Sequence, residues 1–364
     1  MKKQIIFMAQ QLKSGGAEKV IILLANALAE RQDYTVSLHI VLKSEPIVPI
    51  SEKVNVKFLT NCILKKENVI QKCVRKVFEL NAIRKNIRKI NNSVVISSCN
   101  EYSKIISKNT NKTNYIIAQL HNDYTSKLLY DFCNKYTNIN LFVLLNETFR
   151  KEIEPEMKKK NSFTKVTVIP NFIENIESED VEKEKIVFSA GRFHWVKGFE
   201  RLVEVWSLIP FEEKNGWKLV IAGDGEEFEK IKKLIKNKGL ENTIILPGRL
   251  ENDEIYSYMR KSMIYALSSY SEAFPMVLLE AMQNRLPVIA FDVRTGPRCI
   301  IKNNETGYLI KDFDNESYAK KLVELMNNTE LQQCMGNAAY LESKKYLKKN
   351  IIQQWFEIID NINI

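Results

Sequence analysis

The chain has 364 residues, which exceeds the roughly 250 to 300 residues at which single cores usually divide, so we expect two domains. Its hydrophobic fraction of 45% indicates a globular protein, and its apolar runs are too short for a signal peptide or a membrane span. The net charge is +10, and the six cysteines show neither Cys-x-x-Cys pairs nor histidines at metal spacing. These features exclude a disulfide framework and a zinc site, and they favour reduced thiols in a cytoplasm.

The amino-terminal half alternates short apolar runs with helical patterns. The runs "QIIFMAQ", "TVSLHIVL", "SVVISS", "NYIIAQLH" and "NLFVLLN" predict strands, and "AEKVIILLANALAE" predicts a helix. Strands that alternate with helices are typical of a parallel sheet covered on both faces. The pattern predicts a doubly wound α/β domain over residues 1–170, followed by an acidic linker over residues 171–185.

Much of the positive charge lies in a predicted helix between Lys65 and Lys89. Its apolar residues recur at helical spacing against a face rich in lysine and arginine: Val69, Ile70, Cys73, Val77, Leu80, Ile83, Ile87 and Ile90. Such a helix either packs on its own domain or lies on an anionic membrane surface. Nucleic acid is disfavoured as a partner, because aromatic residues do not interleave with the basic ones.

The alternation of strand and helix patterns begins again after the linker and predicts a second domain over residues 186–345. Strands are expected at "KIVFSAG", "WKLVIAGDG", "NTIILPG", "MIYALSS" and "LPVIAFD", with helices between them. A last helix is expected within residues 346–364. Two similar doubly wound domains with a ligand cleft between them explain this pattern, because ligands of such sheets bind at the carboxyl ends of the strands.

Two glycine-containing loops join a strand to a helix and are candidates for ligand binding. In "SAGRFHWVKGFERL", Arg192 and Lys197 bracket a loop whose Gly198 lies at a helix entry, so both cations could converge on a diphosphate. In "LKSGGAEKVI", Gly15 and Gly16 would permit close approach of a ligand. This second loop is not G-x-G-x-x-G, which disfavours a dinucleotide site of the dehydrogenase type.

The segment "SEAFPMVLLEAM" carries Glu272 and Glu280 at either end of an apolar run. Pro275 is expected at the first position of a helix, with Glu272 in the preceding loop and Glu280 inside the helix. The two carboxylates would then be about 10 Å apart, near or beyond the limit for a glycosidase acid/base pair. We interpret them as two anchors for one elongated ligand, with the N–H groups of Phe274 and Met276 between them.

Five signatures in order resemble the retaining family 4 glycosyltransferases of the GT-B architecture. They are "GGAE" at residues 15–18, "GRF" and "KG" within residues 191–198, "IAGDG" at 221–225, "LPGRL" at 246–250, and the pair Glu272 and Glu280. The resemblance implies two Rossmann-like domains that face a central cleft. It further implies that the first domain binds the acceptor and the second the nucleotide sugar, while the terminal helix returns to the first domain.

The resemblance also implies roles for individual residues. Glu272 would contact the donor sugar and Glu280 the ribose, while Arg192 and Lys197 hold the diphosphate. His121, in "AQLHND", would be a catalytic-site histidine near the sugar. The remaining donor contacts would come from Gly15, Gly16, Gly191, Arg249, Leu250, Ala273, Phe274, Pro275 and Met276. Ala273 stands where the family often has glycine, which would narrow the sugar pocket.

The implied activity is retaining transfer of a hexose or N-acetylhexosamine from a UDP-sugar. The acceptor would be a lipid-linked or surface-polysaccharide glycan, and the enzyme would be cytoplasmic or peripheral on the inner face of the plasma membrane. No Asp-x-Asp motif is present, so neither a metal nor another cofactor is expected. One alternative is a GT-B-shaped epimerase, which would alter the donor without transfer. Another is a non-catalytic partner subunit, which would release no nucleotide by itself.

Overall fold

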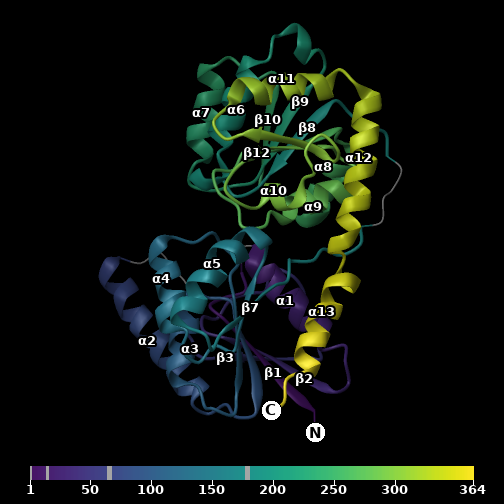
Figure 1. The fold of residues 1–364 in the computed structure, drawn as a ribbon. Helices are drawn as coiled ribbons and strands as arrows, with labels where there is room; N and C mark the ends of the chain where they lie inside the picture. The colour runs from purple at the N-terminus through teal and green to yellow at the C-terminus, as the bar shows by residue number, and fades with distance from the viewer. Residues whose placement is uncertain (1, 14–15, 64–67, 177–180) are drawn as a thin grey trace. The chain divides into compact units, whose positions relative to one another are not determined.

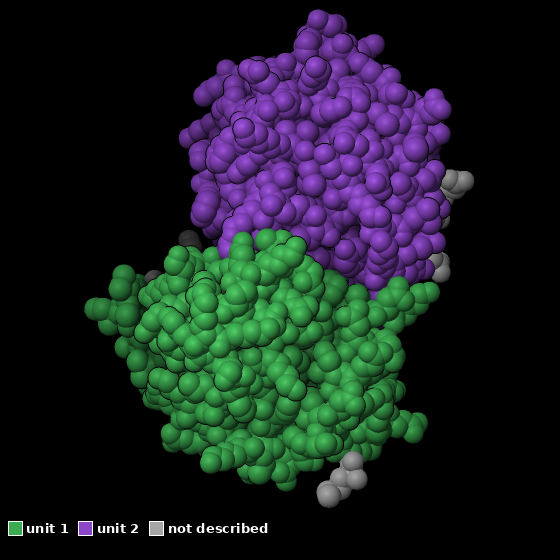
Figure 2. Space-filling model, viewed as in Figure 1, with its two compact units in different colours: residues 1–171, 349–364 green, residues 172–348 purple. Residues whose placement is uncertain are grey.

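The computed structural model describes residues 2–13, 16–63, 68–176 and 181–364. The chain divides into two compact units, coloured separately in Figure 2. Unit 1 comprises residues 1–171 and 349–364, and unit 2 comprises residues 172–348. Each unit is a parallel α/β sheet with helices on its faces, as the sequence predicted (Figure 1).

Unit 1 contains a seven-stranded sheet in the order β3-β2-β1-β4-β5-β6-β7. The strands are β1 (Lys3–Ala9), β2 (Tyr34–Ile40), β3 (Val54–Phe58), β4 (Ser93–Ser97), β5 (Tyr115–Gln119), β6 (Leu141–Leu144) and β7 (Lys165–Val168). The helices are α1 (Gly16–Leu28), α2 (Val69–Ile87), α3 (Asn100–Asn109), α4 (Ser126–Lys135), α5 (Glu147–Lys160) and α13 (Lys348–Asp360). The central strands are continuous apolar runs because both of their faces are buried. The edge strands β3 and β7 are more exposed and lack such a run, so the sequence pattern did not reveal them.

Unit 2 contains a six-stranded sheet in the order β10-β9-β8-β11-β12-β13. The strands are β8 (Ile186–Ala190), β9 (Lys218–Ala222), β10 (Ile244–Gly248), β11 (Ile264–Leu267), β12 (Val288–Asp292) and β13 (Gly307–Lys311). The α-helices are α6 (Phe199–Leu208), α7 (Phe228–Asn237), α8 (Asn252–Lys261), α9 (Met276–Gln283), α10 (Pro297–Ile300), α11 (Asn315–Met326) and α12 (Thr329–Ser343). Three short 3-10 helices are η1 (Trp195–Lys197), η2 (Glu212–Lys214) and η3 (Lys344–Tyr346).

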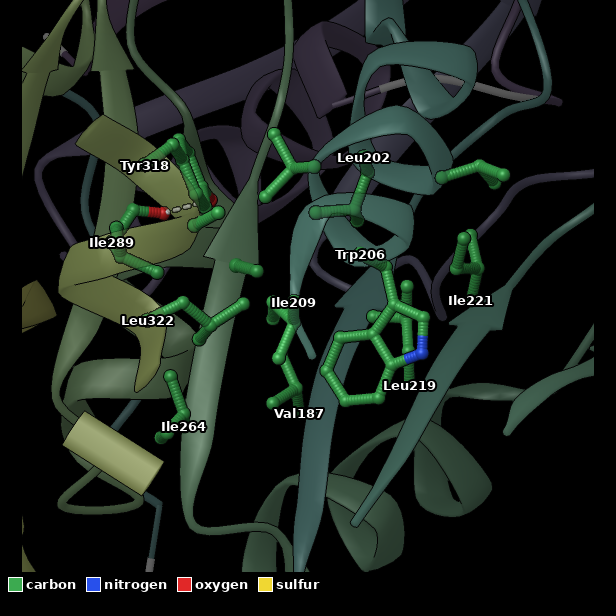
Figure 3. Close-up of a cluster of buried hydrophobic side chains, with 14 of the residues drawn as sticks. Val187, Leu202, Trp206, Ile209, Leu219, Ile221, Ile264, Ile289, Tyr318 and Leu322 are labelled. Carbon is green, nitrogen blue, oxygen red and sulfur yellow. Dashed lines mark hydrogen bonds between the residues drawn. The ribbon is translucent and has the colours of Figure 1, made fainter. Parts of the chain in front are cut away.

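The core of unit 2 lies between the sheet and helices α6 and α11 (Figure 3). Trp206 of α6 is fully buried, and its indole N–H donates to the Thr243 hydroxyl at 3.1 Å. Tyr318 of α11 is also fully buried, and its hydroxyl donates to the Ile289 carbonyl at 2.9 Å. Both large side chains therefore bury apolar surface without leaving their polar atoms unpaired.

The predicted linker packs on unit 2 where the structure describes it. The N–H of Ile173 donates to the Tyr346 carbonyl at 2.9 Å, and the N–H of Glu184 donates to the Lys261 carbonyl at 2.7 Å. Burial lowers the pKa of Lys183 to about 8. The acidic composition predicted an interdomain linker over residues 171–185, and the structure assigns residues 172–176 and 181–185 to the second unit.

Helix α2 packs on its own domain, one of the two alternatives left open by the sequence, along only part of its length. Its carboxyl-terminal half packs on unit 1, where Ile83 and Ile87 are fully buried. Its amino-terminal half leaves large apolar side chains in solvent, including Ile70 at 75% exposure and Phe78 at 62%. Within the described ranges, no helix is both long enough and apolar enough to cross a bilayer.

The carboxyl-terminal helix α13 packs within unit 1. Trp355 and Ile359 are buried, and the Phe356 ring lies 6.2 Å from the Tyr34 ring, centroid to centroid. The Tyr34 hydroxyl donates to the Asp360 carboxylate at 2.5 Å. Because β2 supplies Tyr34, residues more than 300 positions apart complete one core.

We expect Trp355→Ala to lower the free energy of unfolding of unit 1 by about 3 to 5 kcal/mol, because it removes a buried indole and leaves a cavity. Urea denaturation of the full chain, followed by far-ultraviolet circular dichroism, measures this loss. Gln353→Ala, on the exposed face of the same helix, is the matched control. An unchanged unfolding midpoint for Trp355→Ala would show that α13 contributes nothing to unit 1.

Candidate active site

In each sheet there is one position between two adjacent strands from which the chain continues to opposite edges of the sheet. This position is called the switch point. In unit 2 this position lies between β8 and β11, because β9 and β10 extend the sheet on the other side of β8. In unit 1 it lies between β1 and β4. Ligands of doubly wound sheets bind at such switch points, outside the carboxyl ends of the strands. The loops at these two positions are therefore the candidate ligand-binding loops.

The loop after β8 passes directly over the end of β11. Gly198 has φ of 60°, and a Cβ there would lie 2.4 Å from the Ser268 carbonyl oxygen, so a larger residue would clash with the backbone. The imidazole Nδ1 of His194 accepts the Val196 N–H at 3.2 Å and caps the 3-10 helix η1. Lys197, at the end of η1, is thereby held against the residues that follow β11.

The "IAGDG" turn after β9 supports this loop from the other side. Gly223 has φ of 140°, and a Cβ there would lie 1.9 Å from the Gly191 carbonyl oxygen. The Phe193 N–H donates to the Asp224 carbonyl at 2.7 Å, and the Glu227 N–H donates to the Phe193 carbonyl at 2.9 Å. These contacts fix the backbone that carries Arg192.

Lys197 and Glu272 meet at the switch point of unit 2. The Lys197 ammonium lies 2.6 Å from Oε1 of Glu272, and the Ser269 hydroxyl donates to the same oxygen at 2.7 Å. The Glu272 side chain is 11% exposed. The Thr295 hydroxyl donates to the Glu272 backbone carbonyl at 2.6 Å. The structure thus brings together two residues that the sequence singled out separately.

Helix α9 starts one residue later than the sequence predicted. Pro275 is the residue before the helix, with φ of −73° and ψ of 94°, so its backbone is extended and Met276 begins the first turn. Ala273 and Phe274 are buried, the latter with its ring edge-on to Tyr346 at 5.6 Å. These two residues therefore pack into unit 2, and a role in donor binding remains a prediction.

Glu280 lies in α9 and is half-buried. Its carboxylate accepts the Tyr256 hydroxyl at 3.4 Å. This contact connects α9 with α8, and it orients one of the two glutamates that we interpreted as anchors. The sequence gave no indication of the Tyr256 contact, because the two residues lie on different helices.

Arg192 has a different partner from Lys197. Its guanidinium lies 3.1 Å from Oε2 of Glu226, and both side chains are largely exposed. A backbone hydrogen bond and the nearby Arg192 lower the pKa of Glu226. Arg249 is exposed and Leu250 half-exposed after β10, two strands away from β8. They lie at the margin of the switch point rather than beside Lys197.

The switch point of unit 1 contains a hollow of about 330 Å³. Its lining comes from the ends of β1, β4 and β5 and from the starts of α1 and α3, and includes Gln10, Glu18, Ser98, Asn100, Glu101, His121 and Asn122. Burial lowers the pKa of His121 to about 4, so its ring is neutral at pH 7. Among the described residues, neither ring nitrogen of His121 has a hydrogen-bond partner, although both are buried. Buried polar atoms of this kind are suited to a ligand.

The glycine turn before α1 is described only in part. Gly15 lies outside the described residues, and Gly16 is the first residue of α1. A Cβ at Gly16 would meet no atom within 4 Å, so open space surrounds it. Beside it, burial raises the pKa of Glu18. In the sequence, Glu18 is recognisable only as the last residue of the "GGAE" signature.

Other functional candidates emerged only from the structure. Ser269 and Thr295 hold Glu272, and Glu226 holds Arg192. Ser269 lies three residues before Glu272, a spacing that could have indicated the contact. Across the described ranges, no three His, Cys, Asp or Glu side chains are grouped as they would be around a metal ion.

Comparisons with known proteins show which families and folds the chain resembles. Residues 171–342 match the model of the family described as glycosyl transferases group 1. The amylovoran biosynthesis glycosyltransferase AmsD of Erwinia amylovora is 28% identical, over 99% of this chain and 100% of that protein. An N-acetylgalactosaminyltransferase of Campylobacter jejuni is 25% identical, over 99% of both chains.

A crystal structure of the S. aureus protein TarM, determined with UDP, superposes with a TM-score of 0.82. The match covers 99% of this chain and 100% of that one at 17% identity, which shows a common fold. The matching region of the family model, the full-length relatives and the common fold together lead to one conclusion: the chain is a glycosyltransferase of the GT-B fold, similar over residues 171–342 to the glycosyl transferases group 1.

Proposed function

We propose that this glycosyltransferase moves a hexose or N-acetylhexosamine from a UDP-sugar to a lipid-linked or surface-polysaccharide glycan. We further propose that the anomeric configuration is retained and that no metal ion or other cofactor is required. The observation that carries the proposal is the pair formed by Lys197 and Glu272 at the switch point of unit 2, 2.6 Å apart. A cation and a hydroxyl-accepting carboxylate are the two groups that a nucleotide sugar needs at its reacting end.

The ion pair suggests how a donor would enter. A diphosphate would attract Lys197 and Arg192, each of which now holds a carboxylate. Glu272 would then be free to accept hydrogen bonds from the sugar hydroxyls, still held by Ser269. Glu280 would accept the ribose hydroxyls. Hydrogen bonds from the sugar hydroxyls and from Ser269 would stabilise the Glu272 carboxylate after Lys197 turns to the diphosphate.

The comparisons support the choice of donor and acceptor. The TarM structure contains UDP, which supports a uridine nucleotide as the donor carrier. The Campylobacter jejuni relative is named for an acceptor glycan on undecaprenol diphosphate, and the Erwinia amylovora relative for amylovoran biosynthesis. These names support a glycan built on a lipid carrier or a secreted polysaccharide.

Retention without a covalent intermediate is the mechanism we propose. The acceptor hydroxyl oxygen attacks the anomeric carbon on the face where the diphosphate departs. The bond from that carbon to the diphosphate oxygen breaks, and this oxygen takes the acceptor proton, so UDP leaves. Arg192 and Lys197 stabilise the charge on the leaving group, as preorganised cations do. Glu272 positions the sugar within unit 2, and the role of His121 near the sugar stays a prediction from the family resemblance.

We propose that helix α2 rests on an anionic membrane surface. At about 100° per residue, the exposed Ile70, Val74 and Val77 lie on the side of α2 opposite to its buried residues. The same outward face continues into the exposed Arg84 and Lys85. Figure 1 draws α2 at the outer margin of its unit. An outward face that is first apolar and then cationic fits acyl chains and anionic headgroups.

Lys197→Ala and Arg192→Ala should each reduce turnover about 30-fold to 1000-fold, equivalent to about 2 to 4 kcal/mol. The physical reason is that the charge on the departing diphosphate exceeds that in the bound donor. Steady-state assays of UDP release over a panel of UDP-sugars measure the effect. Lys230→Ala removes an exposed lysine of the same unit and is the control. A raised Michaelis constant with unchanged turnover would mean that the two cations only bind substrate.

Glu272→Gln should retain measurable transfer with the same anomeric product, because the amide keeps the shape and part of the hydrogen bonding. Nuclear magnetic resonance of the product determines its anomeric configuration, and mass spectrometry searches for a glycosyl ester. Trapping that ester on Glu272 would replace front-face attack by a covalent mechanism. Activity that is abolished by EDTA and restored by manganese would refute independence from metal.

Replacing Ile70 and Val77 together by serine should weaken binding to vesicles at least a hundredfold, because each inserted side chain contributes about 1.5 to 3 kcal/mol. Co-sedimentation with vesicles of phosphatidylcholine and phosphatidylglycerol measures the partitioning. Val56→Ser, on exposed strand β3, serves as the control. Equal binding of the double variant and the parent protein would exclude α2 as the contact.

A further inference from the structure

Three aromatic side chains form an exposed row on unit 2 that the proposed reaction does not use. The rings of Trp195 and Tyr270 are 6.5 Å apart, and those of Tyr270 and Phe313 are 6.1 Å apart, centroid to centroid. Their interplanar angles are 36° and 39°. Trp195 is 58% exposed and Phe313 is 73% exposed. Clustered exposed aromatic surface of this kind usually marks a binding site.

The row is held rigidly from below by Arg201. The guanidinium carbon of this buried arginine lies 4.5 Å from the centre of the Tyr270 ring and 5.0 Å from that of Phe313. Nη2 of Arg201 lies 2.7 Å from Oδ1 of Asp312. The same Asp312 oxygen accepts the Phe313 N–H at 3.1 Å. The arginine and the aspartate therefore fix both the rings and the loop that carries Phe313.

The backbone at Phe313 is unfavourable for a bulky residue. Its φ is 66°, in the left-handed region that glycine and asparagine adopt most readily. Strain of this kind persists only where surrounding contacts enforce it, and it is concentrated at functional sites. Here the strain keeps a large apolar ring in solvent, where it adds little to the stability of the fold.

The row begins at the candidate donor site. Trp195 belongs to the same 3-10 helix as Lys197, and Tyr270 lies two residues before Glu272. The Tyr270 N–H donates to the Val196 carbonyl at 2.7 Å and so joins the two loops. At its other end, Phe313 borders a hollow of about 540 Å³ whose lining is mostly polar: Leu208, Lys311, Asp312, Asp314, Asn315 and Glu316.

We infer that the row of Trp195, Tyr270 and Phe313 binds a stretch of the glycan acceptor, as a chain of pyranose residues. The inference rests on the proposed function. The C–H face of a pyranose ring is apolar and stacks on aromatic rings, while its equatorial hydroxyls need polar partners at the edges. The row supplies successive ring faces, and the carboxylates and amide around Phe313 supply those partners. Continuity with the donor site favours a glycan over a second copy of the chain.

Trp195 provides a direct signal for binding. The chain's other tryptophans, Trp206, Trp217 and Trp355, are at most 3% exposed, so acrylamide quenching reports mainly on Trp195. The probes are chitohexaose and maltohexaose, with N-acetylglucosamine and glucose as monosaccharide comparisons. At least one hexasaccharide should protect Trp195 saturably, and its monosaccharide should bind at least tenfold more weakly.

The variant Phe313→Ala should weaken hexasaccharide binding about tenfold. Phe211→Ala removes another exposed phenylalanine of unit 2, outside the row, and should leave binding unchanged. In transfer assays, Phe313→Ala should raise the Michaelis constant for a long acceptor, while UDP release from the donor alone stays at the parental rate. This separation distinguishes a glycan subsite from a general loss of structure.

The outcomes separate this inference from the proposed function. If neither hexasaccharide protects Trp195 while the protein still releases UDP from a UDP-sugar, the subsite is refuted and the proposed function stands. If Phe313→Ala and the parent protein bind the hexasaccharides equally, the row is also refuted. Sedimentation that shows a dimer lost on Phe313→Ala, with unchanged hexasaccharide binding, would assign the row to self-association instead.

Discussion

The close contact between the loop after β8 and the end of β11 is the constraint on which the candidate active site depends. A Cβ at Gly198 would lie 2.4 Å from the Ser268 carbonyl oxygen, so only glycine permits this approach. The Ser268 hydroxyl donates to the Lys197 carbonyl at 3.0 Å and closes the contact. Because the two loops touch here, Lys197 reaches Glu272 across the switch point of the sheet.

The two units apply the same sheet topology to different chemistry. At its switch point, unit 2 places the cation of Lys197 beside a carboxylate, which suits a charged and polar donor. Unit 1 instead lines its hollow with polar groups that include Glu101, and burial shifts Glu18 and His121 toward the uncharged form. Such a hollow offers hydrogen-bond partners to a polar ligand. The common architecture thus supports two distinct kinds of ligand site.

Two features of the molecule expose large apolar side chains that a folded chain usually buries. The outward face of α2 and the row of Trp195, Tyr270 and Phe313 both leave large apolar side chains in solvent. In each case the reverse side is well packed, by Ile83 and Ile87 beneath α2 and by Arg201 beneath the rings. Ordered but exposed apolar surface contributes little to folding, which is why we propose binding for both.

The sequence by itself determined the α/β class, the repeated sheet architecture and most of the central strands, because buried parallel strands are continuous apolar runs. It also located Lys197, Glu272 and Glu280 through local motifs at strand ends. It could not reveal β3 and β7, whose edge positions leave them partly exposed and without an apolar pattern. Nor could it show that residues 172–176 and 181–185 pack on unit 2 through backbone hydrogen bonds, which any composition can form.

Only the tertiary structure decided which side chains meet. The pairing of Lys197 with Glu272 joins residues 75 positions apart, and that of Arg201 with Asp312 joins residues 111 positions apart. The identity of such partners depends on strand order and on the approach of separate loops. Local propensity and periodicity carry no information about either, because they describe each segment by itself. The sequence therefore identified charged residues such as Lys197 and Glu272, and the fold determined that they are partners.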